Sequence, residues 1–228
     1  MSAYSHGRRI RIDKYETAPA QSKSAVLVLH GAGGILFDGP EMRRVSRRLA
    51  EAGNTVYLVH YFNRTGTIVG LARGMQKNFE TWLETVRDCI VSVQKERGDA
   101  SLVGLYGYSL GAFLAVAAAS NNPEVGALVE HAGGIWNGKM ERVKRMPPAL
   151  LIHGEADRRV PFQKYAQPLV ALLRERGANF ETRFFPEEGH VFSAEAMAQV
   201  RDAAAGFFAR HLAPKRSGVA HPRQLGEN

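Results

Sequence analysis

Residues 101–120 read SLVGLYGYSLGAFLAVAAAS, and this stretch decides the fold. Its first six residues are almost all apolar, as is typical of a strand buried on both faces of a parallel sheet. Gly107 and Gly111 then bracket Ser109, and an alanine-rich run typical of a helix follows at once. This strand–turn–helix pattern predicts a sharp, strained turn that projects the serine hydroxyl above the sheet. We therefore expect Ser109 to be a nucleophile, with the N–H of Leu110 facing the negative charge that develops beside it.

Short apolar runs alternate with amphipathic helical patterns on both sides of this stretch. The expected strands cover residues 25–30, 55–61, 101–106, 127–131, 149–153 and 179–185, with a more polar edge strand at 8–15. The expected helices cover residues 41–52, 77–97, 110–120, 163–176 and 194–212. Such alternation predicts an α/β fold, with a mostly parallel central sheet and helices on both faces. Residues 1–213 are expected to form a single domain, and the polar residues 214–228 a flexible C-terminal tail.

The composition is that of an ordinary soluble globular protein. No apolar run approaches the roughly 20 residues that span a bilayer, and residues 1–16 lack the apolar stretch of a secretory signal, so we expect a cytoplasmic protein. The net charge is +8, but the basic residues are scattered and do not interleave with aromatic ones as in a nucleic-acid groove. We therefore expect a small-molecule substrate, no nucleic-acid or membrane partner, and a monomer or homodimer. The single cysteine, Cys89, falls on an apolar helix face and is expected to be buried.

A serine hydroxyl needs a base near neutral pH, and the chain offers one downstream. His190 follows the last expected strand, and an imidazole can accept the serine proton and return it to the leaving group. Asp157 lies just past the strand at 149–153, where it would orient that imidazole and stabilise its charged form. Both positions fall at the carboxyl edge of the sheet, where the ligand sites of open parallel sheets lie. Alternatives for the acid are Glu155 and Glu130, and alternatives for the base are His131 and His153.

The sequence HGAGG at residues 30–34 follows the first buried strand. Attack on a carbonyl group creates an oxyanion, which backbone N–H donors stabilise. We expect one donor from Leu110 and a second from Ala32, with Gly33 as the next choice and close to the substrate. Glycines here let the backbone approach the reacting carbon. A dinucleotide site is not expected, because Leu36 stands where the motif G-x-G-x-x-G requires its last glycine.

Taken together, HGAGG, GYSLG, HGEADRRVPF and EEGHVF resemble the dienelactone hydrolase branch of the α/β-hydrolases, over roughly residues 25–212. HYFNRTG at residues 60–66 also resembles the segment after the fourth strand in that branch. The resemblance implies an α/β-hydrolase fold without a lid domain, hydrolysis of small esters or lactones, and no cofactor. Dienelactone hydrolases proper have cysteine at the elbow, whereas Ser109 favours a general carboxylesterase-like role. Arg64 lies where the family segment could present a cation to a substrate carboxylate, and is equally a candidate surface arginine.

The leading hypothesis is a serine hydrolase that cleaves small carboxylic esters or lactones through an acyl-enzyme intermediate. Thioesters and peptide-like substrates are variants of the same mechanism. Two other classes stay open: a non-catalytic protein that binds a ligand in the hydrolase pocket, and a metallohydrolase. Four histidines each end an expected strand, but their spacing matches no helical two-histidine motif, so we expect no metal; they are His30, His60, His131 and His153. Side chains from the loops near Phe37, Tyr61, Trp136 and Phe192 are expected to line the pocket, and Tyr108 and Trp136 are expected to contact the substrate.

Overall fold

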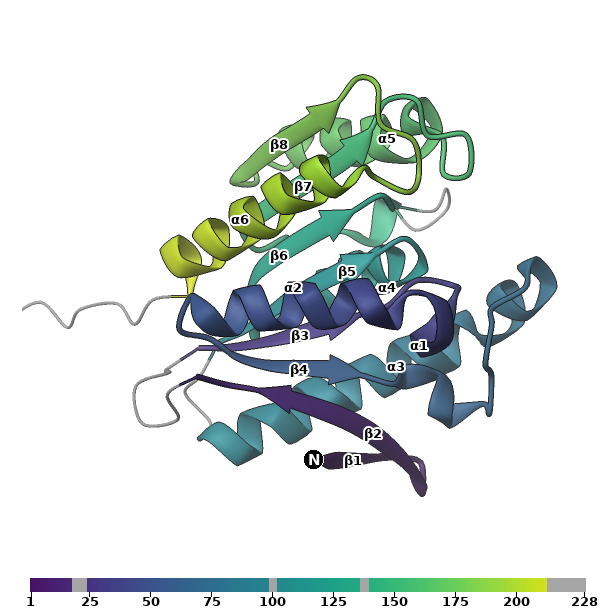
Figure 1. Ribbon diagram of the computed structural model, residues 1–228, viewed down its shortest axis with the longest axis vertical. Coiled ribbons are helices and arrows are strands. Elements are labelled where there is room, and N and C mark those ends of the chain that lie inside the picture. The colour runs from purple at the N-terminus through teal and green to yellow at the C-terminus, as the bar shows by residue number, and fades with distance from the viewer. Residues whose placement is uncertain (18–23, 99–101, 136–139, 213–228) are drawn as a thin grey trace, which may run out of the picture.

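The computed structural model describes residues 1–17, 24–98, 102–135 and 140–212 (Figure 1). Eight strands in this part of the chain form one sheet, in the order β1-β2-β4-β3-β5-β6-β7-β8. The six strands from β4 to β8 in that order run parallel to one another, and β1 and β2 are antiparallel. The predicted fold class, a mostly parallel sheet with helices on both faces, is confirmed.

The strands and helices match most of the predicted elements, with shifted ends. The strands are β1 (Ser2–Ser5), β2 (Arg8–Tyr15), β3 (Ala25–Leu29), β4 (Thr55–Val59), β5 (Val103–Tyr108), β6 (Val125–His131), β7 (Ala149–Gly154) and β8 (Phe180–Phe185). The helices are α1 (Gly34–Phe37), α2 (Gly39–Glu51), α3 (Ala72–Arg97), α4 (Leu110–Ala119), α5 (Phe162–Glu175) and α6 (Ala194–His211). Two short 3-10 helices, η1 (Tyr61–Arg64) and η2 (Met140–Arg142), lie in loops.

Two helical layers cover the sheet. Helices α2 and α6 pack on one face, and α3, α4 and α5 pack on the other (Figure 1). Alternate side chains of a strand point to opposite faces, so Val26 and Val28 face the first layer while Leu27 and Leu29 face the second. This explains why the inner strands are apolar throughout. Cys89 lies in the second layer and is fully buried, as predicted.

One end of the sheet differs from the prediction. Residues 8–15 were expected to form an edge strand, but β1 pairs with β2 and takes the edge position instead. The side chains of Ala3 and Ser5 are buried while that of Tyr4 is exposed, an alternation too short to stand out in a four-residue strand. The edge assignment is therefore wrong, although the bounds of β2 are as predicted.

The carboxyl ends of the parallel strands all lie at one edge of the sheet, on the right in Figure 1. The loops that follow β3, β5, β7 and β8 gather there and carry the predicted site residues. In the segment 133–147, where no lid domain was expected, the described residues hold η2. None of the described helices combines the length and the apolar character needed to cross a membrane. The predicted tail at 214–228 lies outside the described residues.

Candidate active site

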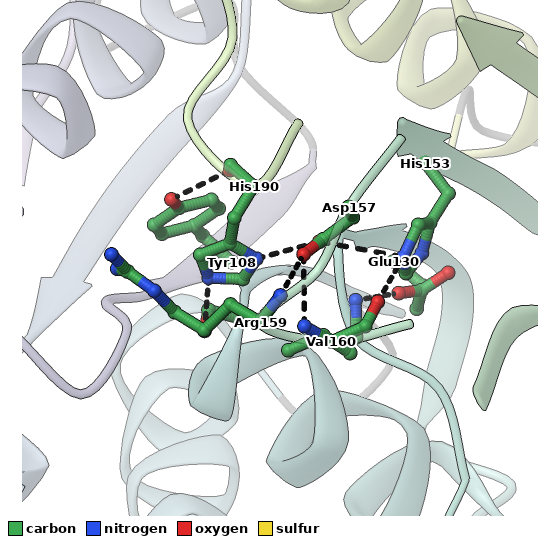
Figure 2. A network of polar contacts seen from close by, with 9 residues as sticks. Tyr108, Glu130, His153, Asp157, Arg159, Val160 and His190 are labelled. Carbon is green, nitrogen blue, oxygen red and sulfur yellow. Dashed lines mark hydrogen bonds and ion pairs between the residues drawn. The ribbon is translucent and has the colours of Figure 1, made fainter. Parts of the chain in front are cut away.

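Ser109, His190 and Asp157 come from three separate loops and meet at the carboxyl edge of the sheet. The Nε2 atom of His190 lies 2.9 Å from the Oγ of Ser109. The Nδ1 atom of the same ring lies 2.7 Å from the Oδ2 of Asp157, and Figure 2 shows the imidazole turned toward that carboxylate. The three side chains are therefore within hydrogen-bond reach of one another, in the order that a nucleophile, a base and an orienting acid require.

Ser109 sits on a turn that its glycine neighbours make possible. Its backbone has φ 52° and ψ −119°, a strained conformation for a residue with a side chain. Its N–H donates to the carbonyl of His131 at 2.8 Å, which ties the turn to β6. A Cβ on Gly107 would overlap the carbonyl oxygen of Gly111, and a Cβ on Gly111 would overlap that of Leu29. Neither glycine therefore has room for a side chain, in agreement with the sharp turn that the sequence predicts.

Asp157 is fixed by the turn that follows β7. Its Oδ1 accepts hydrogen bonds from the backbone N–H groups of Arg159 and Val160, each at 2.8 Å, and its side chain is fully buried (Figure 2). One carboxylate oxygen therefore faces the backbone while the other faces the imidazole of His190. This arrangement holds the carboxylate in one orientation, as the predicted role of an orienting acid requires.

The loop that carries His190 is anchored on both sides. The N–H of Ala156 donates to the carbonyl of Glu188 at 3.1 Å, which joins this loop to the turn after β7. The carboxylate of Glu188 accepts from the N–H and the hydroxyl of Ser193, at 2.8 and 2.6 Å, which joins it to the start of α6. The hydroxyl of Tyr108 donates to the carbonyl of His190 at 3.1 Å. These contacts fix the backbone of the loop, and the loop in turn positions the imidazole of His190.

The two predicted oxyanion donors lie on either side of the nucleophile. Leu110 is the first residue of α4, so its N–H has no acceptor within the helix. Ala32 lies in the loop after β3, where a Cβ on the preceding Gly31 would be 3.1 Å from the Cβ of Ser109. Within the described residues, neither N–H donates a backbone hydrogen bond. Both remain available to an oxyanion, and their role stays a prediction.

Several solved structures share this fold, although no curated protein matches the sequence. An α/β serine hydrolase without a lid from Xanthomonas campestris has a TM-score of 0.71 at 20% identity, over 94% of this chain and 95% of that one. Est1E from Butyrivibrio proteoclasticus has a TM-score of 0.71 at 16% identity, over 94% and 99%. A dienelactone hydrolase-like promiscuous phosphotriesterase from metagenomic libraries has a TM-score of 0.76 at 16% identity, over 92% and 96%. At these identities the likeness shows the α/β-hydrolase fold.

The family model for the dienelactone hydrolase family matches residues 12–212 of this sequence. The chain belongs to the dienelactone hydrolase family. The resemblance drawn from the four motifs is thereby confirmed, and the family membership supports hydrolase activity.

This dienelactone hydrolase family member has a charged residue at the site that the sequence analysis missed. Asp38 follows α1, and its carboxylate folds back over residues 31–34, which we call the oxyanion loop because Ala32 is a predicted oxyanion donor. A Cβ on Gly31 would lie 2.8 Å from its Oδ2, and a Cβ on Gly33 would lie 2.6 Å from its Oδ1. Burial raises the pKa of Asp38, and the N–H of Gly33 and the nearby His190 oppose that shift. A lone aspartate ahead of Gly-Pro is typical of an ordinary helix N-cap, so no sequence signal marked it.

Buried histidines lie in the core close to Ser109, Asp157 and His190 in this family member. His30, His131 and His153 are all buried, and each bonds within the fold. A ring nitrogen of His131 lies 2.9 Å from the hydroxyl of Tyr106, and one of His153 lies 2.8 Å from the carbonyl of Val160. Burial lowers the pKa of His30 to about 4 and that of His131 to about 3. Burial also lowers the pKa of His153, against the opposing effect of its bond to the carbonyl of Val160. These three side chains are therefore uncharged near neutral pH.

The four histidines weighed as metal ligands do not come together. His60 pairs with the carboxylate of Asp13 at 3.0 Å. His30 stacks on Tyr61, with ring centroids 4.2 Å apart. Among the residues that the structure describes, no group of three or more possible metal ligands is present. The geometry therefore gives the metallohydrolase hypothesis no support.

The alternative acids and bases are occupied elsewhere. Glu130 is fully buried beneath the elbow, where its Oε1 accepts from the N–H of Gly133 at 2.5 Å (Figure 2). Burial raises the pKa of Glu130 to about 8, against the opposing effect of that N–H. Glu155 is exposed. Asp157 rather than either glutamate therefore contacts the imidazole of His190.

Some of the residues named for the pocket line a hollow in the structure, and others do not. Phe37, Tyr108 and Phe192 line a hollow of about 360 Å³, together with Arg159. The lining also includes Val191, so the hollow touches the chain neighbours of both Ser109 and His190. Tyr61 itself is fully buried and its hydroxyl donates to the carbonyl of His30 at 2.7 Å, so its side chain does not line this hollow. Its sequence position after a strand suited a pocket, but its ring packs into the core instead. Arg64 is half-buried on η1, Gly33 lies under Asp38, and Trp136 lies outside the described residues.

Proposed function

We propose that this chain is a serine hydrolase that cleaves small carboxylic esters or lactones through an acyl-enzyme intermediate. The observation that carries the proposal is the single imidazole placed between the Oγ of Ser109 and the Oδ2 of Asp157. The strained turn at Ser109 supports it, because strain of this kind is found where a reactive group must be held in place.

The first half of the reaction forms the acyl-enzyme. The Oγ of Ser109 bonds to the carbonyl carbon while the Nε2 of His190 takes the hydroxyl proton. The carbonyl electron pair moves to its oxygen, which the N–H groups of Ala32 and Leu110 stabilise. The bond to the leaving alcohol then breaks, and the alcohol oxygen takes the proton from His190. Asp157 stabilises the imidazolium that exists between the two proton transfers.

The second half repeats these steps with water. His190 takes a proton from the water molecule as its oxygen bonds to the acyl carbon. The bond to the Oγ of Ser109 breaks, the proton returns to that oxygen, and the carboxylic acid leaves. The same residues in the same places therefore serve both halves, and the open carboxyl edge of the sheet admits the water.

The test is covalent labelling combined with turnover of p-nitrophenyl acetate. We expect the wild type to react with a fluorophosphonate probe at Ser109, and Ser109→Ala to lose both the label and at least about 10⁴-fold in kcat. Ser92→Ala is the matched control, because Ser92 donates to the carbonyl of Asp88 within α3, away from the site. A wild type that takes no label and turns over no ester would contradict the proposal. Saturable binding of esters without turnover would favour the binding-protein alternative.

A further inference from the structure

Exposed apolar side chains gather at the mouth of the site. Ten large apolar residues are exposed in the described part of the chain, and five of these form what we call the apolar collar. Each collar side chain is between 63% and 74% exposed; the five are Leu36, Phe37, Ile68, Leu71 and Val191. Single exposed apolar residues are ordinary, but a group beside a reactive site marks a surface that binds something.

Two segments of the collar flank the oxyanion loop. The backbone of Ile68 touches Gly34, where a Cβ would overlap its carbonyl oxygen. The N–H of Gly70 donates to the carbonyl of Ala32 at 2.7 Å. Leu36 belongs to α1, which begins at Gly34. Figure 1 shows α1 and the loop that leads into α3 at the carboxyl edge of the sheet. The collar residues 36, 37, 68 and 71 thus lie on both sides of the loop that carries a predicted oxyanion donor.

The third segment completes the collar on the side of the base. Val191 directly follows His190 and, with Phe37, lines the hollow of about 360 Å³. Three more apolar side chains wall this hollow, namely Met42, Phe192 and Met197. Tyr108, the residue before the nucleophile, lines it as well. The hollow thus reaches Tyr108 and Val191, the chain neighbours of Ser109 and His190, and it meets the exposed collar at Phe37 and Val191.

The charged groups at the hollow do not oppose an apolar ligand. Glu41 is held by Arg44 and Arg201 at 3.0 and 2.5 Å, so its charge is compensated. The carboxylate of Asp38 points back to the oxyanion loop, as its contacts with the glycines there show. Arg159 is exposed, and the flexible stem of an arginine can lie along apolar surface while its charge stays in water.

We propose that the apolar collar and the hollow bind a linear aliphatic chain attached to the ester group of a single substrate molecule. This inference rests on the proposed function and specifies its substrate class. The collar side chains are exposed to water when the site is empty, and a bound chain would remove apolar surface on both partners from water. Because the chain contacts the collar throughout the reaction, a longer chain should raise kcat/KM.

The test compares chain lengths in two substrate series, all below the critical micelle concentration. One series is p-nitrophenyl acetate, butyrate and octanoate, and the other is ethyl, butyl and octyl acetate. We expect wild-type kcat/KM to rise from the shortest to the longest member of at least one series. Ile68→Ser and Leu71→Ser should together lower the ratio of long-chain to short-chain kcat/KM by roughly tenfold.

Leu102→Ser is the matched control, since Leu102 is an exposed leucine at the opposite end of β5, and this variant should keep the wild-type ratio. A flat chain-length profile in both series, with acetate turnover intact, would overturn the collar proposal and leave the proposed function standing. A separate titration carries p-nitrophenyl octanoate through its critical micelle concentration; a rate that rises only above that concentration would also overturn the collar proposal, in favour of a lipid surface as the ligand. Absence of turnover on every ester, with no label on Ser109, would instead be the failure of the proposed function.

Discussion

The elbow at residues 107–111 and the apolar collar lie at the same edge of the sheet but are built in opposite ways. At the elbow, backbone contacts leave no room for a side chain on either glycine, and the N–H of Ser109 is bonded to β6. At the collar, the side chains stand mostly in water and few contacts constrain them. If both proposals hold, the difference teaches that the backbone fixes the geometry of the reaction, while exposed side chains that can change freely select the substrate.

Asp157→Asn tests the fixed half of this comparison and should have the largest effect. An asparagine at this position disfavours the tautomer of His190 that accepts the proton of Ser109. We expect kcat to fall about 10³- to 10⁴-fold, with little change in KM, as measured with p-nitrophenyl acetate. A loss smaller than about tenfold would show that the acid at this position does not orient the base.

Glu130→Gln probes the layer directly beneath the elbow. The pKa of Glu130 is raised from 4.5 to about 8, so the folded protein keeps a proton that the unfolded chain releases. The free energy of unfolding should therefore fall as the pH rises from about 4.5 to about 8. Glutamine still accepts from the N–H of Gly133 but cannot ionise, so the variant should avoid this fall. Relative to the wild type, we expect it to gain about 2–4 kcal/mol between about pH 5 and about pH 8.5.

Urea unfolding of both proteins across this pH range measures the difference. Parallel stability curves for the wild type and Glu130→Gln would contradict the buried, protonated state of the glutamate. Acetate turnover at pH 7 serves as the control, because Glu130 does not contact His190 and the variant should keep most of the wild-type rate.

Asp38→Ala probes the boundary between the two regions and should have the smallest effect. Its carboxylate lies against Gly31 and Gly33, on either side of Ala32, so its removal should loosen the loop that carries this predicted donor. We expect kcat to fall about tenfold with KM nearly unchanged, less than the loss of a direct oxyanion donor. Asp38→Asn, which keeps an acceptor oxygen, should restore most of the rate. If the alanine and asparagine variants behaved alike, the carboxylate would not be a positioning group.

Much of the fold and the three central residues could be predicted from the sequence. The inner strands are apolar on both faces, and Gly107 and Gly111 surround Ser109 at a strand–helix junction, which leaves few other interpretations. The positions of His190 and Asp157 followed from the parallel sheet, because loops after parallel strands meet at one edge. Their contacts with each other needed the structure, since they depend on how each loop closes.

The elements that escaped prediction are short or depend on tertiary contacts. β1 has four residues and gains its strand geometry by pairing with β2. α1 also has four residues, which is too short to produce a helical pattern in the sequence. It begins at Gly34, whose φ of 63° lies outside the right-handed helical region. The roles of Asp38 and Tyr61 depend on which way a side chain turns after a strand or helix ends. Local periodicity contains no information on that direction.

The buried neutral histidines close to the site have an electrostatic consequence. Buried uncharged rings screen electric charge less than water does. The attraction between the carboxylate of Asp157 and a protonated His190 is therefore stronger than it would be in water. The same neutral histidines make the free energy of unfolding depend on pH. Because the pKa values of His30 and His131 are lowered in the folded protein, the unfolded chain binds protons more readily as the pH falls below about 6.5. The buried neutral histidines that strengthen the ion pair thus make the folded protein progressively less stable in acid.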